Sequence, residues 1–270
     1  MMKLYVSTGA LCTRKNGRDW RVIPPAAENL DCDGLEFMMY DSWYDRWEAV
    51  VRDLMGLNFP TMHVEKCLGE KLTADTPESL ALAREEFEIN CEMARLLGAK
   101  LLVLHLWNGL PSDGNFAANL RAYPALRETA EKFGLLLTVE NIVCRFGDPL
   151  AHFRELQAAW GNVAFTFDVK LAQFHGQTES AFSPEHAWMW NGPVRHVHVS
   201  DFAGETMDWS ALRSLHPGQG RVNFPGFFEN LKRVGYDGGV TIESTSVEED
   251  GRVDFPRLSE SLKLLRGWMG

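Results

Sequence analysis

Cysteine is sparse in this chain of 270 residues, and no two cysteines stand at the spacing of a redox or zinc motif. The number of cysteines is odd and no Cys-x-x-Cys pair occurs, so neither a disulfide framework nor a zinc ribbon is indicated. This usage fits a reducing, cytoplasmic compartment. The five residues are Cys12, Cys32, Cys67, Cys91 and Cys144.

Positive charge is also in short supply, with 27 basic against 37 acidic residues and a net charge of −10. Such a surface repels phosphate backbones and acidic lipid headgroups, which disfavours nucleic acid and membranes as partners. No hydrophobic run reaches membrane-spanning length, and the first residues break at Ser7 and Gly9 before a signal-peptide core can form. No segment matches a phosphate-binding loop or a dinucleotide fingerprint. We therefore expect a soluble protein.

Strand-like runs alternate with helical patterns along the whole chain, and 45% of the residues are hydrophobic. This alternation is typical of a parallel sheet whose strands are joined by crossover helices. Eight strand-helix units predict an α/β fold, a (β/α)₈ TIM barrel that forms one domain over residues 1–270. The expected strands are 4–7, 34–38, 59–64, 101–106, 135–140, 163–168, 194–198 and 239–243.

Four of these strands end in a side chain that can bind a divalent metal: Glu140, Asp168, His198 and Glu243. A parallel barrel gathers the carboxyl ends of its strands around one point, so these residues are expected to converge. Carboxylates with one imidazole favour Mn²⁺, Mg²⁺ or Co²⁺ and accept Zn²⁺, and the absence of thiolates argues against a structural zinc site. The pattern predicts one catalytic divalent ion. His196, on the same strand face as His198, is the alternative imidazole ligand.

A divalent ion in an open site can bind a carbonyl oxygen and its neighbouring hydroxyl, which acidifies the C–H between them and stabilises an enediolate. Glu140 and Glu243 are the candidate catalytic bases, since they would approach the substrate from different strands. Opposed bases allow epimerisation, whereas one base that moves a proton between adjacent carbons gives aldose–ketose isomerisation.

Several further residues near the expected strand ends are candidates for binding the substrate. For each, a structural role is the alternative: a hydrogen-bonded core histidine, a packed tryptophan, or a charge in solvent. A lone glutamate inside the second strand is expensive to bury without a role, so it is expected at the mouth of the barrel. The candidates are Glu36, His63, His105, Trp107, His175 and Arg221.

Several motifs resemble the xylose isomerase-like TIM barrels, a superfamily of sugar isomerases and epimerases. They are VEN at Glu140, FDVK at Asp168, HVHVSD at His198, HPGQGRVNFPGFF from His216 and GGVTIES at Glu243. The resemblance implies that the four strand-end residues bind one divalent metal and that the two glutamates form an acid–base pair. It implies a small carbohydrate as partner, namely a sugar, a keto-sugar, an inosose or hydroxypyruvate. A homo-oligomer stays open.

The chain departs from that family at Leu171, where many relatives carry a histidine three residues after the metal-binding aspartate; His175 is a candidate substitute. The superfamily also contains abasic-site nucleases of the endonuclease IV type, which use histidines matching His63 and His105. That alternative needs the missing histidine, as well as an Asp-x-His where Asp208-Trp209-Ser210 stands, and the negative charge opposes DNA. A dehydratase acting on an inosose needs only a differently placed acid.

Overall fold

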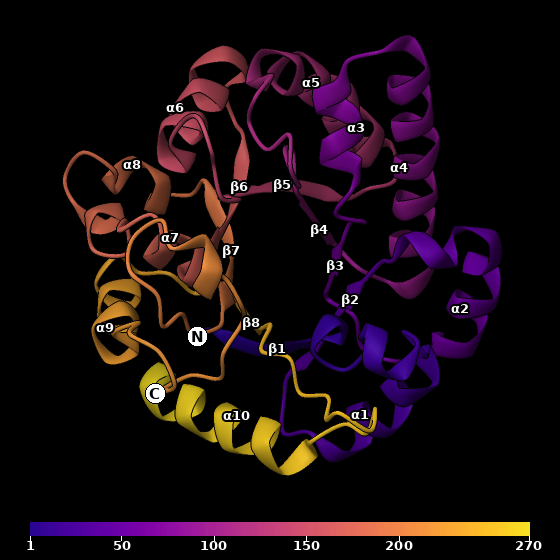
Figure 1. The fold of residues 1–270 in the computed structure, drawn as a ribbon, viewed down its shortest axis with the longest axis vertical. Coiled ribbons are helices and arrows are strands. Elements are labelled where there is room, and N and C mark those ends of the chain that lie inside the picture. The colour runs from indigo at the N-terminus through magenta and orange to yellow at the C-terminus, as the bar shows by residue number, and fades with distance from the viewer. The chain divides into compact units, whose positions relative to one another are not determined.

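The eight strands follow one another in chain order around a closed parallel barrel (Figure 1), which confirms the predicted fold class. The computed structural model describes residues 1–270. The strands are β1 (Lys3–Ser7), β2 (Gly34–Met38), β3 (Thr61–His63), β4 (Leu101–Leu104), β5 (Leu136–Glu140), β6 (Ala164–Asp168), β7 (Val194–Val199) and β8 (Gly239–Ile242).

Helices connect successive strands, and their ends follow from local capping. In the longest helix, Thr76 accepts a hydrogen bond from the backbone of Ser79, Pro77 occupies the first turn, and Gly98 ends it with a left-handed φ of 84°. The helices are α1 (Ile23–Asn29), α2 (Trp47–Leu54), α3 (Leu68–Ala74), α4 (Pro77–Leu97), α5 (Phe116–Lys132), α6 (Pro149–Trp160), α7 (Val169–Phe174), α8 (Ala187–Trp190), α9 (Phe224–Arg233) and α10 (Phe255–Met269). None of them is both long and apolar enough to cross a membrane.

The chain divides into two compact units, one of residues Met1–Glu36 and Phe167–Gly270 and one of Phe37–Thr166. In the first unit β1 pairs with β2 and with β8, and β8 pairs with β7. In the second unit β3, β4, β5 and β6 pair in that order. The prediction that residues 1–270 form one domain stays a prediction.

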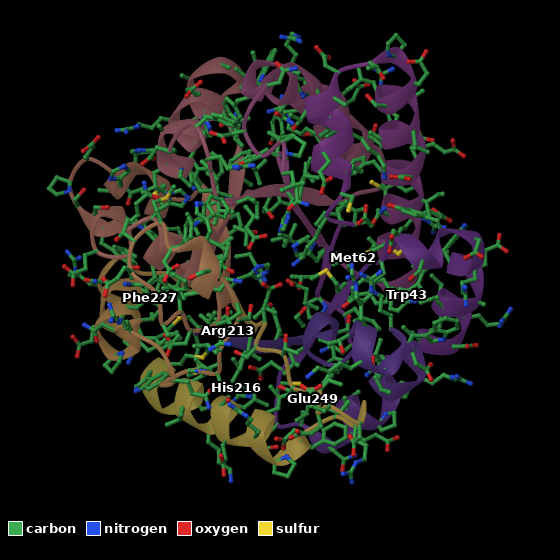
Figure 2. All side chains as sticks on the ribbon, in the orientation of Figure 1. Trp43, Met62, Arg213, His216, Phe227 and Glu249 are labelled. Atoms are coloured by element: carbon green, nitrogen blue, oxygen red, sulfur yellow. The ribbon has the colours of Figure 1, made fainter.

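Each unit has its own cluster of buried aromatic side chains, and Figure 2 labels one member of each. In the first unit the ring of Phe227 packs against Phe167 and Phe182. In the second, Trp43 packs against the buried Phe37 and the half-buried Tyr40. These rings are large apolar surfaces removed from water, each contributing about 1.5 to 3 kcal/mol on full burial.

Some elements differ from their expected bounds. Residues 59–64 were expected as a strand, but β3 is confined to Thr61–His63; Pro60 has no N–H to donate to a ladder, although its carbonyl accepts from Lys100. β8 ends at Ile242, so Glu243 is the first residue beyond it rather than its last. The helix α3 and the short 3₁₀ turns before α1 carry no clear periodicity in the sequence.

Candidate active site

Three potential metal ligands meet in the first unit: Asp168, His198 and Glu243. Asp168 is the last residue of β6, His198 lies near the end of β7, and Glu243 follows β8 directly. One ligand atom from each lies within 4.8 Å of the others, and Nδ1 of His198 is 3.7 Å from Oε1 of Glu243. Asp168 and His198 are buried, and the Glu243 side chain is 9% exposed.

Asp168 belongs to two elements at once, because it ends β6 and caps α7. Its Oδ1 accepts a hydrogen bond of 2.8 Å from the backbone N–H of Leu171. The strand therefore runs into the helix without a loop, and the carboxylate is oriented by the first turn of α7. Leu171, which stands where the resemblance led us to look for a histidine, contributes a backbone donor to Asp168.

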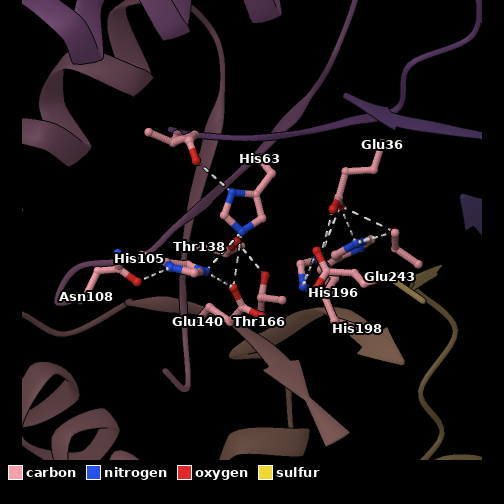
Figure 3. Close-up of polar contacts among 12 residues, drawn as sticks. Glu36, His63, His105, Asn108, Thr138, Glu140, Thr166, His196, His198 and Glu243 are labelled. Atoms are coloured by element: carbon pink, nitrogen blue, oxygen red, sulfur yellow. Dashed lines mark hydrogen bonds and ion pairs between the residues drawn. The ribbon is translucent and has the colours of Figure 1, made fainter. Parts of the chain in front are cut away.

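The other ring nitrogen of His198 faces Glu36 on β2 (Figure 3). Nε2 lies 3.1 Å from Oε1 and 3.2 Å from Oε2 of Glu36. His196, the alternative imidazole ligand, points to Glu36 as well, with Nε2 2.9 Å from Oε2 and 2.9 Å from the hydroxyl of Thr241. Complete burial raises the pKa of Glu36, but the adjacent His198 and His196 rings outweigh burial and hold this pKa well below its ordinary value.

Glu140, at the end of β5, lies among two histidines of the second unit (Figure 3). Its Oε2 is 2.8 Å from Nε2 of His105 and 3.3 Å from Nε2 of His63, and the two ring nitrogens are 3.2 Å apart. Nδ1 of His63 donates to the Val64 carbonyl at 2.7 Å. Burial lowers the pKa of His105 to about 4, against the opposing effect of Glu140, so this ring is neutral at pH 7.

The remaining candidates for substrate binding lie in different settings. Trp107 is fully buried; its Nε1 donates to the Ile142 carbonyl and its ring packs on Phe116. His175 ends α7 and is half-buried. Arg221 forms an exposed ion pair with Glu205. A role in substrate binding stays a prediction for all three.

Sequence reasoning missed three polar residues that organise these surroundings. Thr241 donates to Glu36 at 3.3 Å, and Oδ1 of Asn108 lies 3.0 Å from Nδ1 of His105. Asp201, two residues after β7, accepts backbone hydrogen bonds from Phe202, Gly218, Gly220 and Val222. A buried acidic residue followed by a glycine-rich turn was the available signal, since such a turn presents several N–H groups.

The segment that Asp201 organises borders a polar cavity of about 420 Å³ in the first unit. Basic and acidic side chains both line it, including Arg213, His216 and Glu249, which Figure 2 labels. The imidazole of His216 is held by the hydroxyl of Ser261 at 2.8 Å. The mixed charge suits neutral polar groups better than an anion.

The donor set fits a divalent cation. Two carboxylates and one imidazole approach one point in the first unit from three successive strand ends, and no thiolate is among them. Hard cations such as Mg²⁺ and Mn²⁺ prefer oxygen donors, and imidazole also suits Co²⁺ and Zn²⁺. Burying such carboxylates without a counter-charge is costly, and a cation removes that cost.

The sequence of residues 24–267 matches the model of one protein family, the xylose isomerase-like TIM barrels. The chain belongs to this family. Since the match covers most of the chain, it includes β2 to β8 and every candidate residue named above. No curated protein matches the sequence.

Solved structures of sugar epimerases share the xylose isomerase-like fold. A xylose isomerase domain protein from Alicyclobacillus acidocaldarius is 18% identical, with a TM-score of 0.72 over 100% of this chain and 98% of that one. D-psicose 3-epimerase from Clostridium cellulolyticum, solved with D-tagatose, is 14% identical (TM-score 0.69; 99% of each chain). 3-Keto-D-glucoside 4-epimerase from E. coli is 19% identical (TM-score 0.66; 99% of this chain and 100% of that one). At these identities the likeness concerns the fold.

Proposed function

We propose that the protein is a divalent-metal-dependent isomerase or epimerase of a small sugar, keto-sugar or inosose. The observation that carries this proposal is the meeting of Asp168, His198 and Glu243 behind three successive strands of a closed barrel. Catalysis in barrels of this kind takes place at the carboxyl ends of the strands. The five free cysteines are compatible with a cytoplasmic protein.

Glu140 is proposed as the fourth ligand. Within the second unit Glu140 pairs in register with Thr166 on β6, and Asp168 lies two residues further along that same strand. Residues separated by two positions on a strand point to the same face, so Asp168 points to the same face as Thr166, the partner of Glu140. Glu140 and Asp168 are also the last residues of their strands, which supports placing both at the carboxyl end. The proposed set is then three carboxylates and one imidazole, which favours Mn²⁺, Mg²⁺ or Co²⁺ over a structural zinc.

The proposed chemistry is removal of a proton from the carbon next to a carbonyl group. A divalent cation bound by the four residues would polarise the carbonyl and stabilise the negative charge that develops. Glu140 and Glu243 are the carboxylates that accept and return the proton, each through one oxygen. If both act, one glutamate takes the proton from one face of the carbon and the other, in its protonated form, delivers its own proton to the opposite face, which inverts the carbon; the two glutamates then exchange protons with solvent.

His63 and His105 are proposed to orient Glu140 and to contact hydroxyl groups of the substrate. His105 Nε2 lies at hydrogen-bond distance from the Glu140 carboxylate, and Asn108 fixes the other side of this ring. A neutral imidazole in this position can pass a proton without adding a charge next to the base. The sugar epimerases of similar fold named above support a carbohydrate substrate.

The test measures metal content and proton exchange together. Purified protein should contain about one divalent ion per chain by elemental analysis after incubation with manganese. With a panel of ketoses, inososes and hydroxypyruvate in D₂O, NMR should show deuterium entering the substrate next to its carbonyl group. Protein that binds no divalent ion, or that exchanges no proton in any member of the panel, contradicts the proposal. Loss of water from an inosose after exchange would identify a dehydratase with the same base.

A further inference from the structure

Glu36 is a fully buried carboxylate that two imidazole rings contact through their Nε2 atoms. Nε2 of His198 lies 3.1 Å from Oε1 and 3.2 Å from Oε2, while Nε2 of His196 lies 2.9 Å from Oε2. The Thr241 hydroxyl donates to Oε2 at 3.3 Å. All four residues belong to the first unit and are fully or almost fully buried. The carboxylate is thus surrounded by donors and has no exposed side.

These contacts determine the tautomers of both rings. An ionised carboxylate only accepts hydrogen bonds, so each Nε2 that faces Glu36 must carry a hydrogen. A neutral imidazole has one N–H, and Nδ1 of His198 therefore has a lone pair. This nitrogen lies 3.7 Å from Oε1 of Glu243, on the side of the ring away from Glu36. The hydrogen-bond network, rather than observed hydrogens, assigns this tautomer.

We propose that Glu36 is a positioning residue, which holds His198 as the Nε2–H tautomer and directs the Nδ1 lone pair to the metal. Glu36 was expected from the sequence to contact the substrate, and the proposal gives it this different role. The effect on metal binding rests on the proposed function, whereas the tautomer of His198 does not depend on an ion. Carboxylates behind a ligating imidazole commonly fix the ring and raise its basicity.

His196 and Thr241 complete the support around Glu36. The ring of His196 stacks on Tyr5, with centroids 6.2 Å apart and planes at 16°. Gly239 lies against both rings, since a Cβ there would be 2.5 Å from a Tyr5 ring atom and 2.9 Å from Nδ1 of His196. His196 is consequently held between Tyr5, Gly239 and Glu36 and shares the carboxylate with His198. Neither contact requires an ion.

The first experiment reads the tautomer in metal-free protein. Long-range ¹⁵N–¹H NMR of ¹⁵N-histidine-labelled protein distinguishes the two neutral forms, and loss of one signal set in His198→Asn assigns the ring. We expect Nε2–H for His198 in the wild type. A glutamine at position 36 has only one acceptor oxygen and adds an N–H₂ donor. In Glu36→Gln at least one of the two rings must therefore change tautomer or turn away. Nδ1–H in wild-type His198 overturns the proposal whatever the protein binds.

The second experiment measures Mn²⁺ affinity by titration calorimetry, with Mn²⁺ as the only added ligand. Glu36→Gln should weaken binding roughly 10- to 100-fold, the usual effect of losing a carboxylate behind a metal-bound histidine. Glu65→Gln is the matched control, since Glu65 is a buried glutamate of the other unit whose carboxylate accepts from the Cys67 backbone. Its Mn²⁺ affinity should equal that of the wild type.

The outcomes separate this proposal from the proposed function. Wild-type protein that binds no Mn²⁺ defeats the proposed function, while the NMR result still decides the tautomer. Wild-type binding with an unchanged affinity in Glu36→Gln overturns the positioning role and leaves the cation site intact. If Glu36→Gln does not fold, Thr241→Val removes one hydrogen bond to the carboxylate and should weaken binding by a smaller factor; an unchanged affinity there also counts against the role.

Discussion

Glu140 and Glu243, the two proposed bases, have different neighbours. Glu140 lies against two imidazole rings, whereas Glu243 lies next to the Nδ1 side of His198. One carboxylate is therefore connected to groups that can exchange protons, and the other to a proposed metal ligand. In a two-base epimerase both must act in each turnover, because one carboxylate removes a proton from one face and the other carboxyl group supplies a proton to the opposite face.

The glutamine variants test these roles directly. Glu140→Gln and Glu243→Gln should each slow deuterium exchange of the substrate about 10²- to 10⁴-fold, the range expected for loss of a general base. Exchange is measured by NMR in D₂O with saturating manganese, so that weaker metal binding does not limit the rate. A variant that exchanges at the wild-type rate has lost no base, and its glutamate must then be removed from the mechanism.

His105 gives the stability of the protein a predictable pH dependence. Its folded pKa of about 4 lies below the value of about 6.5 in an unfolded chain, so the unfolded state binds more protons between these values. The free energy of unfolding should therefore rise from about pH 4 to 6.5, with the contribution of this ring fully present above 6.5. Urea titrations of wild type and His105→Gln should show a shallower rise in the variant; parallel curves would disprove the assignment.

Among the elements, the segment after β7 depends on one carboxylate more than on regular structure. Four backbone N–H groups converge on Asp201, and Gly220 fits closely beside it. A Cβ at Gly220 would lie 2.4 Å from Oδ1 of Asp201 and 2.5 Å from the Phe202 carbonyl oxygen. No side chain fits at that position without moving the backbone.

Gly220→Ala should lower the free energy of unfolding by about 1 to 3 kcal/mol, the usual cost of overpacking. Gly267→Ala is the matched control: Gly267 lies in α10 and a Cβ there meets nothing within 4 Å. Alanine in such a helix should stabilise the protein by roughly 0.5 to 1 kcal/mol. Chemical denaturation measures both, and equal effects of the two substitutions would contradict the packing argument.

The type and order of the elements were predictable where local chemistry determines them. Thr76, Pro77 and Gly98 bound α4 through a cap, a first-turn proline and a left-handed glycine, and all three are readable in sequence. The predicted ends of the strands were less accurate, because a strand ends where the backbone hydrogen bonds to the neighbouring strand end, and the sequence does not show where that is. Glu243 illustrates this limit: it was expected as the last residue of the eighth strand, and it is the first residue after β8.

At the scale of the molecule, the strand order followed from the alternation of eight strands with helices, which a parallel sheet can satisfy by closing into a barrel. The contacts that Glu36 and Thr241 make around His198 could not be predicted from the sequence. Glu36 and Thr241 belong to strands that are distant in sequence from His198, and only their registers with β1, β7 and β8 bring the three together. No spacing in the sequence encodes such a contact.

The net charge leads to a prediction for nucleic acid. With a net charge of −10 at pH 7, the protein repels a phosphate backbone at long range, which opposes non-specific binding to DNA. We expect no cleavage of a duplex that contains an abasic site at physiological salt, with or without added manganese or zinc. Gel analysis of the labelled duplex measures this, and efficient nicking would favour the nuclease over the isomerase.

The cap that Asp168 provides to α7 has a consequence for the entropy of binding. Because Oδ1 accepts the Leu171 N–H at 2.8 Å, the helix backbone holds this carboxylate in one orientation without help from a ligand. A side chain that is already immobile loses little conformational freedom when a ligand arrives, so its part of the proposed site is preorganised by the fold.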